Sequence, residues 1–259
     1  MNAPAVDPVV LIPDDEIFVR MNLAERWQHG LLAASFIVLI LTGLPVLSGE
    51  VGFLRLVTGR AVAYTLRGLL HRAAALVLIG DFAWHLLYTV LTPRGRQNFR
   101  DKRPRWRDVR DVLAVFRPGS PKPEFGRYSY VEKFEYWSLL WGSTVMILTG
   151  FFMWGPGLSL KLFPLWLHQV LVVIHGYEAI LAFAAILIWH MYTVHLNPEV
   201  FPMSRIWLDG RMTGAELRRF HPLEHRRILE SRERLYRELL ALDPGDSASG
   251  PAPVRPPSA

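Results

Sequence analysis

Four long apolar segments dominate the pattern of hydrophobic and polar positions along the chain. They cover residues 30–47, 73–91, 136–160 and 165–196. Because a helix needs about 20 mainly apolar residues to cross the hydrocarbon core of a bilayer, each segment is long enough for one span. The predicted spans are at about residues 27–47, 70–91, 134–156 and 167–195. The pattern therefore indicates an all-α fold, an integral membrane four-helix bundle with cytoplasmic amphipathic arms.

The parts of the chain outside the spans differ in composition. A Pro-rich stretch at residues 1–19 indicates an irregular N-terminal arm, which precedes the bundle domain at residues 20–200. Residues 201–242 predict a helical arm, and residues 243–259 have the Pro, Ser, Gly and Ala content of a disordered tail. Between the second and third spans, PRWRDVRDVLAVF predicts a short amphipathic helix on the membrane surface. The N-terminus lacks the basic and apolar pattern of a signal peptide, so we expect the first span to be an uncleaved anchor.

The distribution of positive charge predicts the topology. Of the 29 Lys and Arg residues, 24 lie before the first span, in residues 93–133 or after residue 197, and 5 lie in the other two loops. Loops rich in Lys and Arg stay in the cytoplasm, so both termini should be cytoplasmic in a bacterial inner membrane. The net charge of +6 then reflects topology and contact with lipid, and it does not indicate a nucleic-acid partner.

Cysteine is absent from the chain. Its absence excludes disulfides, iron–sulfur clusters, thiolate zinc sites and covalently attached c-type haem. A redox centre in this protein must therefore depend on histidine.

Histidines recur inside the second and fourth apolar segments at nearly the same spacing. His71 and His85 are 14 residues apart, and His175 and His190 are 15 apart, which corresponds to roughly 21 and 22 Å along a helix. Two helices with a histidine at each of two levels predict two facing imidazole pairs, the arrangement that holds two b haems across a bilayer. The longer spacing turns His190 about 60° from His175, an offset that a π-bulge or a tilted haem would absorb.

The two levels differ in how clearly their ligands are predicted. At the periplasmic level we expect His71 to pair with His175. At the cytoplasmic level His29, His85 and His190 compete for two positions, and helical geometry favours His85, which shares a face with His71. At both levels we expect the bound metal to be haem iron.

Several polar residues near these histidines are further candidates. Arg67 and Arg72 flank His71, either as partners of haem propionates or as interface anchors. Asp81 lies one turn before His85, where it handles protons, orients the imidazole or makes a polar helix contact. The remaining quinone or proton candidates are His85, Glu178, His168 and His195.

Other residues have plainer interpretations. The Thr42-Gly43 and Thr149-Gly150 pairs indicate either close helix packing or space for a porphyrin face. His221 and His225 have zinc-like spacing without a convincing third ligand, and we interpret them as surface residues.

Short motifs resemble the membrane cytochrome b family that includes the gamma subunits of formate dehydrogenases and the b-type subunits of nickel–iron hydrogenases and thiosulfate reductases. The resemblance covers about residues 20–225. Its motifs are ERWQH at residues 25–29, TGL at 42–44, RGLLH ending at His71, GRYSYVEKFEYW before the third span, HGYEA at 175–179, IWHMY at 188–192 and HP at 221–222.

This resemblance implies a ligand set for two b haems. The family's axial histidines correspond to His29, His71, His175 and His190, so the motif favours His29 over His85 as the partner of His190. The fourth-span spacing is one residue longer than in formate dehydrogenase relatives, and His85 is an additional histidine. Both features are similar to the cytochrome b of b6f complexes, and His85 therefore stays the alternative ligand.

The sequence thus predicts a dihaem b-type cytochrome subunit, not a complete enzyme, that passes electrons between the quinone pool and a redox partner. Resemblance to the branch found beside multihaem c-type cytochromes implies a periplasmic partner of that kind. One alternative is the membrane anchor of a formate dehydrogenase, nickel–iron hydrogenase or thiosulfate reductase. A second is a haem-free transporter or scaffold whose histidines relay protons.

Overall fold

The computed structural model describes residues 11–47 and 60–242 of the chain. The first ten residues, the loop containing Arg55 and the tail predicted to be disordered lie outside this part. The chain divides into two compact units. One unit contains residues 1–18, 122–127 and 212–259, and the other contains residues 19–121 and 128–211.

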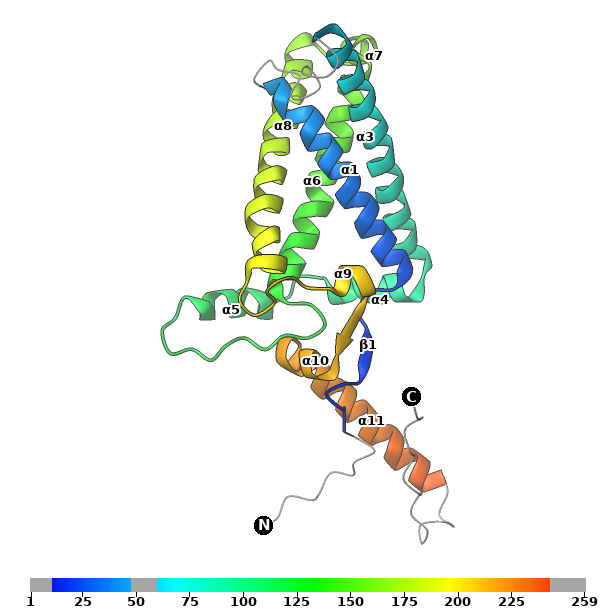
Figure 1. Cartoon of the computed structure of the whole chain (residues 1–259), viewed down its shortest axis with the longest axis vertical. Coiled ribbons are helices and arrows are strands. Elements are labelled where there is room, and N and C mark those ends of the chain that lie inside the picture. The colour runs from blue at the N-terminus through cyan, green and yellow to red at the C-terminus, as the bar shows by residue number, and fades with distance from the viewer. Residues whose placement is uncertain (1–10, 48–59, 243–259) are drawn as a thin grey trace. The chain divides into compact units, whose positions relative to one another are not determined.

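Four long helices form the larger unit, and each is long and apolar enough to cross a membrane. They are α1 (Leu23–Leu47), α3 (Arg60–Leu91), α6 (Tyr130–Trp154) and α8 (Leu165–Ala184), which continues as π-helix to Leu196. The prediction of an all-α membrane helical bundle is confirmed, and the protein is a multi-pass membrane protein (Figure 1).

The four helices pack as two pairs. The most extensive contacts are those of α1 with α3 and of α6 with α8, and smaller contacts join α1 to α8 and α3 to α6. Each pair therefore combines one helix that carries a Thr-Gly sequence with one helix that carries two of the spaced histidines.

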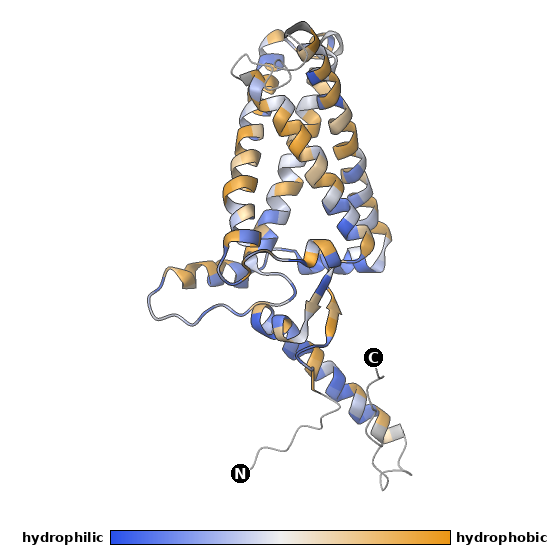
Figure 2. Ribbon diagram, in the orientation of Figure 1, coloured by the Kyte–Doolittle hydropathy of each residue, from blue (hydrophilic) through white to orange (hydrophobic). Residues whose placement is uncertain are grey.

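Polar groups lie inside this bundle and apolar side chains lie outside. Ser35, Thr42, Asp81 and Thr149 are all at most 7% exposed, whereas Ile188 is 71% exposed. Figure 2 shows that apolar residues predominate along the long helices. Because exposed apolar surface of this extent is unfavourable in water, the pattern is that of a bundle whose solvent is lipid.

The last span changes its helical type around His190 and His195. After α8 the chain forms π-helix η1 (Ala185–His190) and, one residue later, π-helix η2 (Tyr192–Leu196). A π-helix turns through fewer degrees per residue than an α-helix, so it reduces the rotation that the 15-residue spacing introduces. The structure thus contains a π-helical segment, the first of the two features expected to absorb the offset between His175 and His190.

Short helices complete the larger unit. They are α4 (Pro93–Asp101), α5 (Trp106–Val115), α7 (Pro156–Leu162) and α9 (Ile206–Asp209). The helix α5 corresponds to the amphipathic segment predicted from the sequence. Helix α4 was not predicted; Thr92 caps it by accepting the backbone N–H of Gly95 at 2.9 Å, and Pro93 occupies its first position.

The smaller unit contains most of a two-stranded sheet and two helices. Strand β1 (Ile17–Val19) pairs with β2 (Arg211–Thr213), and α10 (Gly214–Phe220) and α11 (Pro222–Leu242) follow. We predicted irregular backbone up to residue 19, and the strand β1 differs from that prediction. A three-residue strand leaves almost no periodic signal, and its partner is almost 200 residues away.

His221 is not the surface residue that we predicted. It is 6% exposed, and its Nδ1–H donates to Gly126 O at 2.7 Å because residues 122–127 fold over the start of α11. His225 is only partly covered; this burial lowers its pKa, as does the nearby Arg218, while Asp14 opposes the shift.

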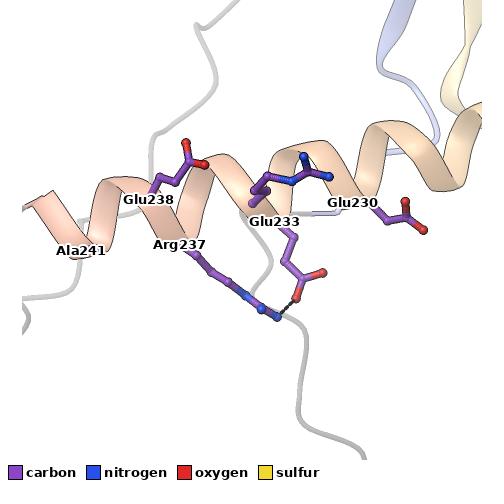
Figure 3. A pocket seen from close by; sticks show the side chains of 6 residues that line it. Glu230, Glu233, Arg237, Glu238 and Ala241 are labelled. Atoms are coloured by element: carbon purple, nitrogen blue, oxygen red, sulfur yellow. Dashed lines mark hydrogen bonds and ion pairs between the residues drawn. The ribbon is translucent and has the colours of Figure 1, made fainter.

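A shallow depression of about 390 Å³ lies along α11 (Figure 3). Its lining residues are Glu230, Glu233, Arg234, Arg237, Glu238 and Ala241. Glu233 and Arg237 form an ion pair one turn apart, which is the usual pattern of a solvated helix face. The depression contains no histidine and does not belong to the candidate site.

Candidate haem site

His71 and His175 face each other from α3 and α8. Their ring centroids are 6.5 Å apart, and the ring planes meet at 66°. Both side chains are half-buried in the bundle. We call these two residues the first pair.

A threonine contacts the Nδ1 atom of each histidine in the first pair. Thr42 Oγ1 lies 2.8 Å from His71 Nδ1, and Thr149 Oγ1 lies 2.7 Å from His175 Nδ1. Each hydroxyl already donates its only hydrogen to a backbone carbonyl, that of Val38 at 2.6 Å or of Val145 at 2.7 Å. The threonine must therefore accept from the ring, which makes Nδ1 the protonated nitrogen and leaves Nε2 with the lone pair. An imidazole in this state can bind a metal through Nε2.

Glycines next to these threonines let the rings approach closely. A Cβ atom at Gly43 would lie 3.2 Å from His71 Cε1, and one at Gly150 would lie 3.3 Å from His175 Cε1. The sequence alone is compatible with either helix packing or a porphyrin face at these glycines. The structure shows that each one accommodates a histidine ring from the neighbouring helix.

His29 and His190 form a second pair, from α1 and η1. Their ring centroids are 6.4 Å apart at an interplanar angle of 44°, and the Trp207 ring lies 5.9 Å from that of His29. His190 Nδ1 lies 3.4 Å from a carboxylate oxygen of Glu135, whose other oxygen accepts from Thr193 at 3.1 Å. His29 Nδ1 is buried without a hydrogen-bond partner.

His85 occupies the same level but has different neighbours. Its Nδ1 lies 3.0 Å from Gln28 Oε1, and its Nε2 lies 3.1 Å from the Tyr136 hydroxyl. Lys102 Nζ lies 4.1 Å from the centre of the Tyr136 ring. Since both ring nitrogens of His85 are engaged, neither is free to bind a metal in this arrangement.

The two helix pairs repeat one arrangement. An offset of 107 residues relates Gln28 to Glu135, His29 to Tyr136, Thr42 to Thr149 and Gly43 to Gly150. In each copy the threonine contacts a histidine of the first pair. Gln28 contacts His85, the second histidine of α3, and Glu135 contacts His190, the second histidine of the last span. The copies differ at one position. His29 lies beside His190, whereas its counterpart Tyr136 bonds to His85.

Both pairs have the separation that two axial ligands of one iron require. An imidazole nitrogen binds a metal at about 2 Å and the ring centre lies about 1 Å further away, so two axial rings have centroids about 6 Å apart. The observed distances are 6.5 and 6.4 Å. Among residues 11–47 and 60–242 there is no group of three or more His, Asp or Glu that could hold a bare metal ion. A haem needs only two such residues, because the porphyrin supplies the other four ligands.

The two arginine candidates contact neighbouring helices near the first pair. Arg67 donates to Thr42 O at 3.1 Å, and the Arg72 guanidinium lies 5.5 Å from the centre of the Trp154 ring. These contacts do not test whether either arginine binds a propionate, which stays a prediction.

The carboxylates and outlying histidines lie at different positions. Asp81 is 7% exposed, and its Oδ1 is buried without a hydrogen-bond partner. Glu178 points at α6, because a Cβ atom at Gly142 would come within 2.7 Å of its Oε1. His168 Nδ1 contacts the buried hydroxyl of Ser159 at 2.9 Å, and His195 is half-buried in η2.

Sequence reasoning missed the residues that hold the histidine rings. The hydroxyls of Thr42 and Thr149, the carboxylate of Glu135 and the pair formed by Gln28 and Tyr136 were not candidates. One signal was present, since Gln28 precedes Thr42 by the same 14 residues that separate Glu135 from Thr149. That spacing matches the histidine spacing of the second span.

Helices of membrane length with two internal histidine pairs have the features expected of a membrane cytochrome of the b type. The family model described as prokaryotic cytochrome b561 matches residues 20–207, and the chain belongs to this family. Comparison with curated proteins gives no match. The chain is thus a b-type cytochrome that binds haem b in the membrane and transfers electrons, and its predicted membrane cytochrome b resemblance is confirmed.

Proposed function

We propose that this chain is the dihaem subunit of a bacterial respiratory complex and passes electrons across the cytoplasmic membrane between the quinone pool and a redox partner. The first pair would hold one haem b and the second pair the other. The observation that supports this most strongly is the presence of two histidine pairs at ligand separation, 6.5 and 6.4 Å between centroids. A haem bound at each level supplies one-electron transfer.

The chain's own residues would keep both rings of the first pair in a ligand-competent state. Thr42 and Thr149 hold the Nδ1–H of His71 and His175 and leave Nε2 free. In the second pair Glu135 orients His190, and Trp207 lies against His29. His29 is preferred to His85 as a ligand because both nitrogens of His85 already have hydrogen-bond partners.

Protons would be exchanged with quinone near the second pair. His85, Gln28 and Tyr136 form a connected hydrogen-bonded group there, and Asp81 has an unpartnered carboxylate oxygen. Such an oxygen is costly to bury, so it is suited to taking up a proton or a ligand hydrogen bond. His195 is a further candidate on this side. Glu178 and His168, three and seven residues from His175 in α8, are the alternative.

A reduced-minus-oxidised absorption spectrum with a haem assay of the purified chain tests the proposal. We expect a b-type alpha band and two haems per chain. One haem per chain would exclude the dihaem subunit, and the absence of the band would favour the haem-free proton relay.

A periplasmic multihaem cytochrome c is the partner we expect, whereas a neighbouring formate dehydrogenase, hydrogenase or thiosulfate reductase gene would favour the membrane-anchor alternative.

The proposed orientation has its own test. Both termini and the loop at residues 93–133 would be cytoplasmic, because 24 of the 29 Lys and Arg residues lie there. Reporter fusions after residue 60 and after residue 110 should report periplasm and cytoplasm respectively. The opposite pattern would exchange the membrane faces of the two pairs.

A further inference from the structure

Thr42 and Thr149 occupy equivalent places in the two helix pairs, and both hydroxyls serve the first pair. Each threonine is 4% exposed, so water does not compete for its hydroxyl. Each gives its hydrogen to a carbonyl four residues earlier on its own helix and accepts from a histidine on the partner helix. The direction of both hydrogen bonds is therefore fixed by the backbone.

We propose that Thr42 and Thr149 are positioning residues that fix the Nδ1–H tautomer of His71 and His175 and set how strongly the two rings donate to a haem iron. This inference rests on the proposed function, since it requires a haem between the two rings. It adds two residues, one from each helix pair, that act through the ligands and not on the iron itself.

The physical argument follows from the state of the ring. An imidazole whose Nδ1–H has an acceptor is a better electron donor at Nε2 than one whose N–H has none. The hydroxyl also limits rotation of the ring, and Gly43 and Gly150 allow the close approach that the bond requires. Loss of the hydroxyl removes a hydrogen-bond acceptor from the ring N–H, which weakens the ligand and destabilises ferric relative to ferrous iron.

The second pair has no such hydroxyl on either ring. His190 faces the carboxylate of Glu135, and His29 Nδ1 has no partner. Removing the threonine hydroxyls should therefore change one haem and not the other. Two substitutions 107 residues apart should act on the same haem.

The test is a redox titration of the purified full-length Thr42→Val and Thr149→Val variants, followed by absorption and EPR spectroscopy. Valine keeps the shape of threonine and removes the hydroxyl. In both variants we expect the same one of the two midpoint potentials to shift to a more positive value. We also expect the affinity for that haem to fall by about 10- to 100-fold. The other haem should keep its potential and its EPR signal.

Two matched variants separate positioning from packing. Thr144→Val removes a hydroxyl that makes the same kind of backbone bond, to Leu140 O at 2.8 Å, on a different face of α6, and it should behave as the wild type. Thr42→Ser keeps the hydroxyl and should restore the wild-type potential. An unchanged or more negative potential in both valine variants would overturn the inference. So would equal loss of both haems, or a serine variant that behaves like the valine variant.

The outcome also separates this inference from the proposed function. If the wild-type chain binds no haem, the proposed function fails. If the wild type binds two haems and the valine variants match it, only the role of the threonines fails.

Discussion

The two histidine pairs have almost the same separation but are held by different groups. In the first pair a neutral hydroxyl holds each ring, one from α1 and one from α6. In the second pair a carboxylate holds His190, and His29 Nδ1 is buried without a partner. The first pair is symmetric and the second is not.

The comparison shows how one helix-pair design can give two different redox environments. A carboxylate acceptor makes an imidazole a stronger donor than a hydroxyl does, and a stronger donor favours ferric iron. His190 should therefore lower the midpoint potential of its haem, whereas His29, whose Nδ1 has no acceptor, should be the weaker donor of that pair. His85, at the same level, forms a hydrogen bond with Tyr136.

The largest effect should come from removing ligands. His71→Met or His175→Met should eliminate the haem of the first pair and reduce the haem content from two to one per chain, because one axial bond is lost. Haem assay and EPR measure the result. His168→Met, on the same helix as His175, is the control and should keep both haems. Retention of two bis-histidine signals in His175→Met would refute the assignment of the first pair.

The choice between His29 and His85 gives the next test. His29→Met should lose the haem of the second pair, whereas His85→Met should retain both haems, because both nitrogens of His85 already bond to Gln28 and Tyr136. Haem counts and EPR of the two variants measure this. If His85→Met loses a haem while His29→Met keeps a bis-histidine signal, the second pair is assigned wrongly.

Proton exchange should be asymmetric between the two levels. Asp81→Asn should slow quinol-linked haem reduction roughly tenfold or more, as expected for loss of a general base, with haem content unchanged. Stopped-flow absorption at the alpha band measures the rate. Glu178→Gln is the matched variant at the level of the first pair and should leave the rate unaltered. The reverse result would move the site to the other level.

Because only the second pair has a carboxylate partner, removing that carboxylate should shift the midpoint potential of the second haem alone. Glu135→Gln should raise the potential of that haem on the order of 60 mV, equivalent to a tenfold weaker ligand for one electron. Spectroelectrochemical titration resolves the two haems. A shift in the other haem, or in neither, would contradict the assignment of Glu135 to His190.

The smallest effect concerns the close approach at the first pair. Gly43→Ala or Gly150→Ala should lower the stability by roughly 1–3 kcal/mol, because a Cβ would lie 3.2 or 3.3 Å from a histidine ring. Gly80→Ala meets no atom within 4 Å and should be neutral or stabilising by about 0.5–1 kcal/mol. Thermal unfolding followed by haem absorption measures the three variants. Equal stability of all three would show that the ring contacts impose no constraint.

The sequence by itself determined the four spans and the two levels of histidine. Membrane-spanning length is a local property, because about 20 apolar residues suffice wherever they occur. The histidine levels follow from the rise per residue, so the proximity of His71 and His175 was expected before the structure was known. The need for a π-helix or tilt was also visible in the 15-residue spacing.

Only the tertiary structure decided which side chains meet across the bundle. Spacing favoured His85 for the second pair and the family motif favoured His29, and the structure places His29 beside His190 and bonds His85 to Tyr136. The partners Thr42 and Glu135 lie 29 and 55 residues from the rings they contact. Such contacts depend on how the helices rotate and tilt against one another. Many weak lateral contacts set that geometry together, and no single stretch of sequence encodes it.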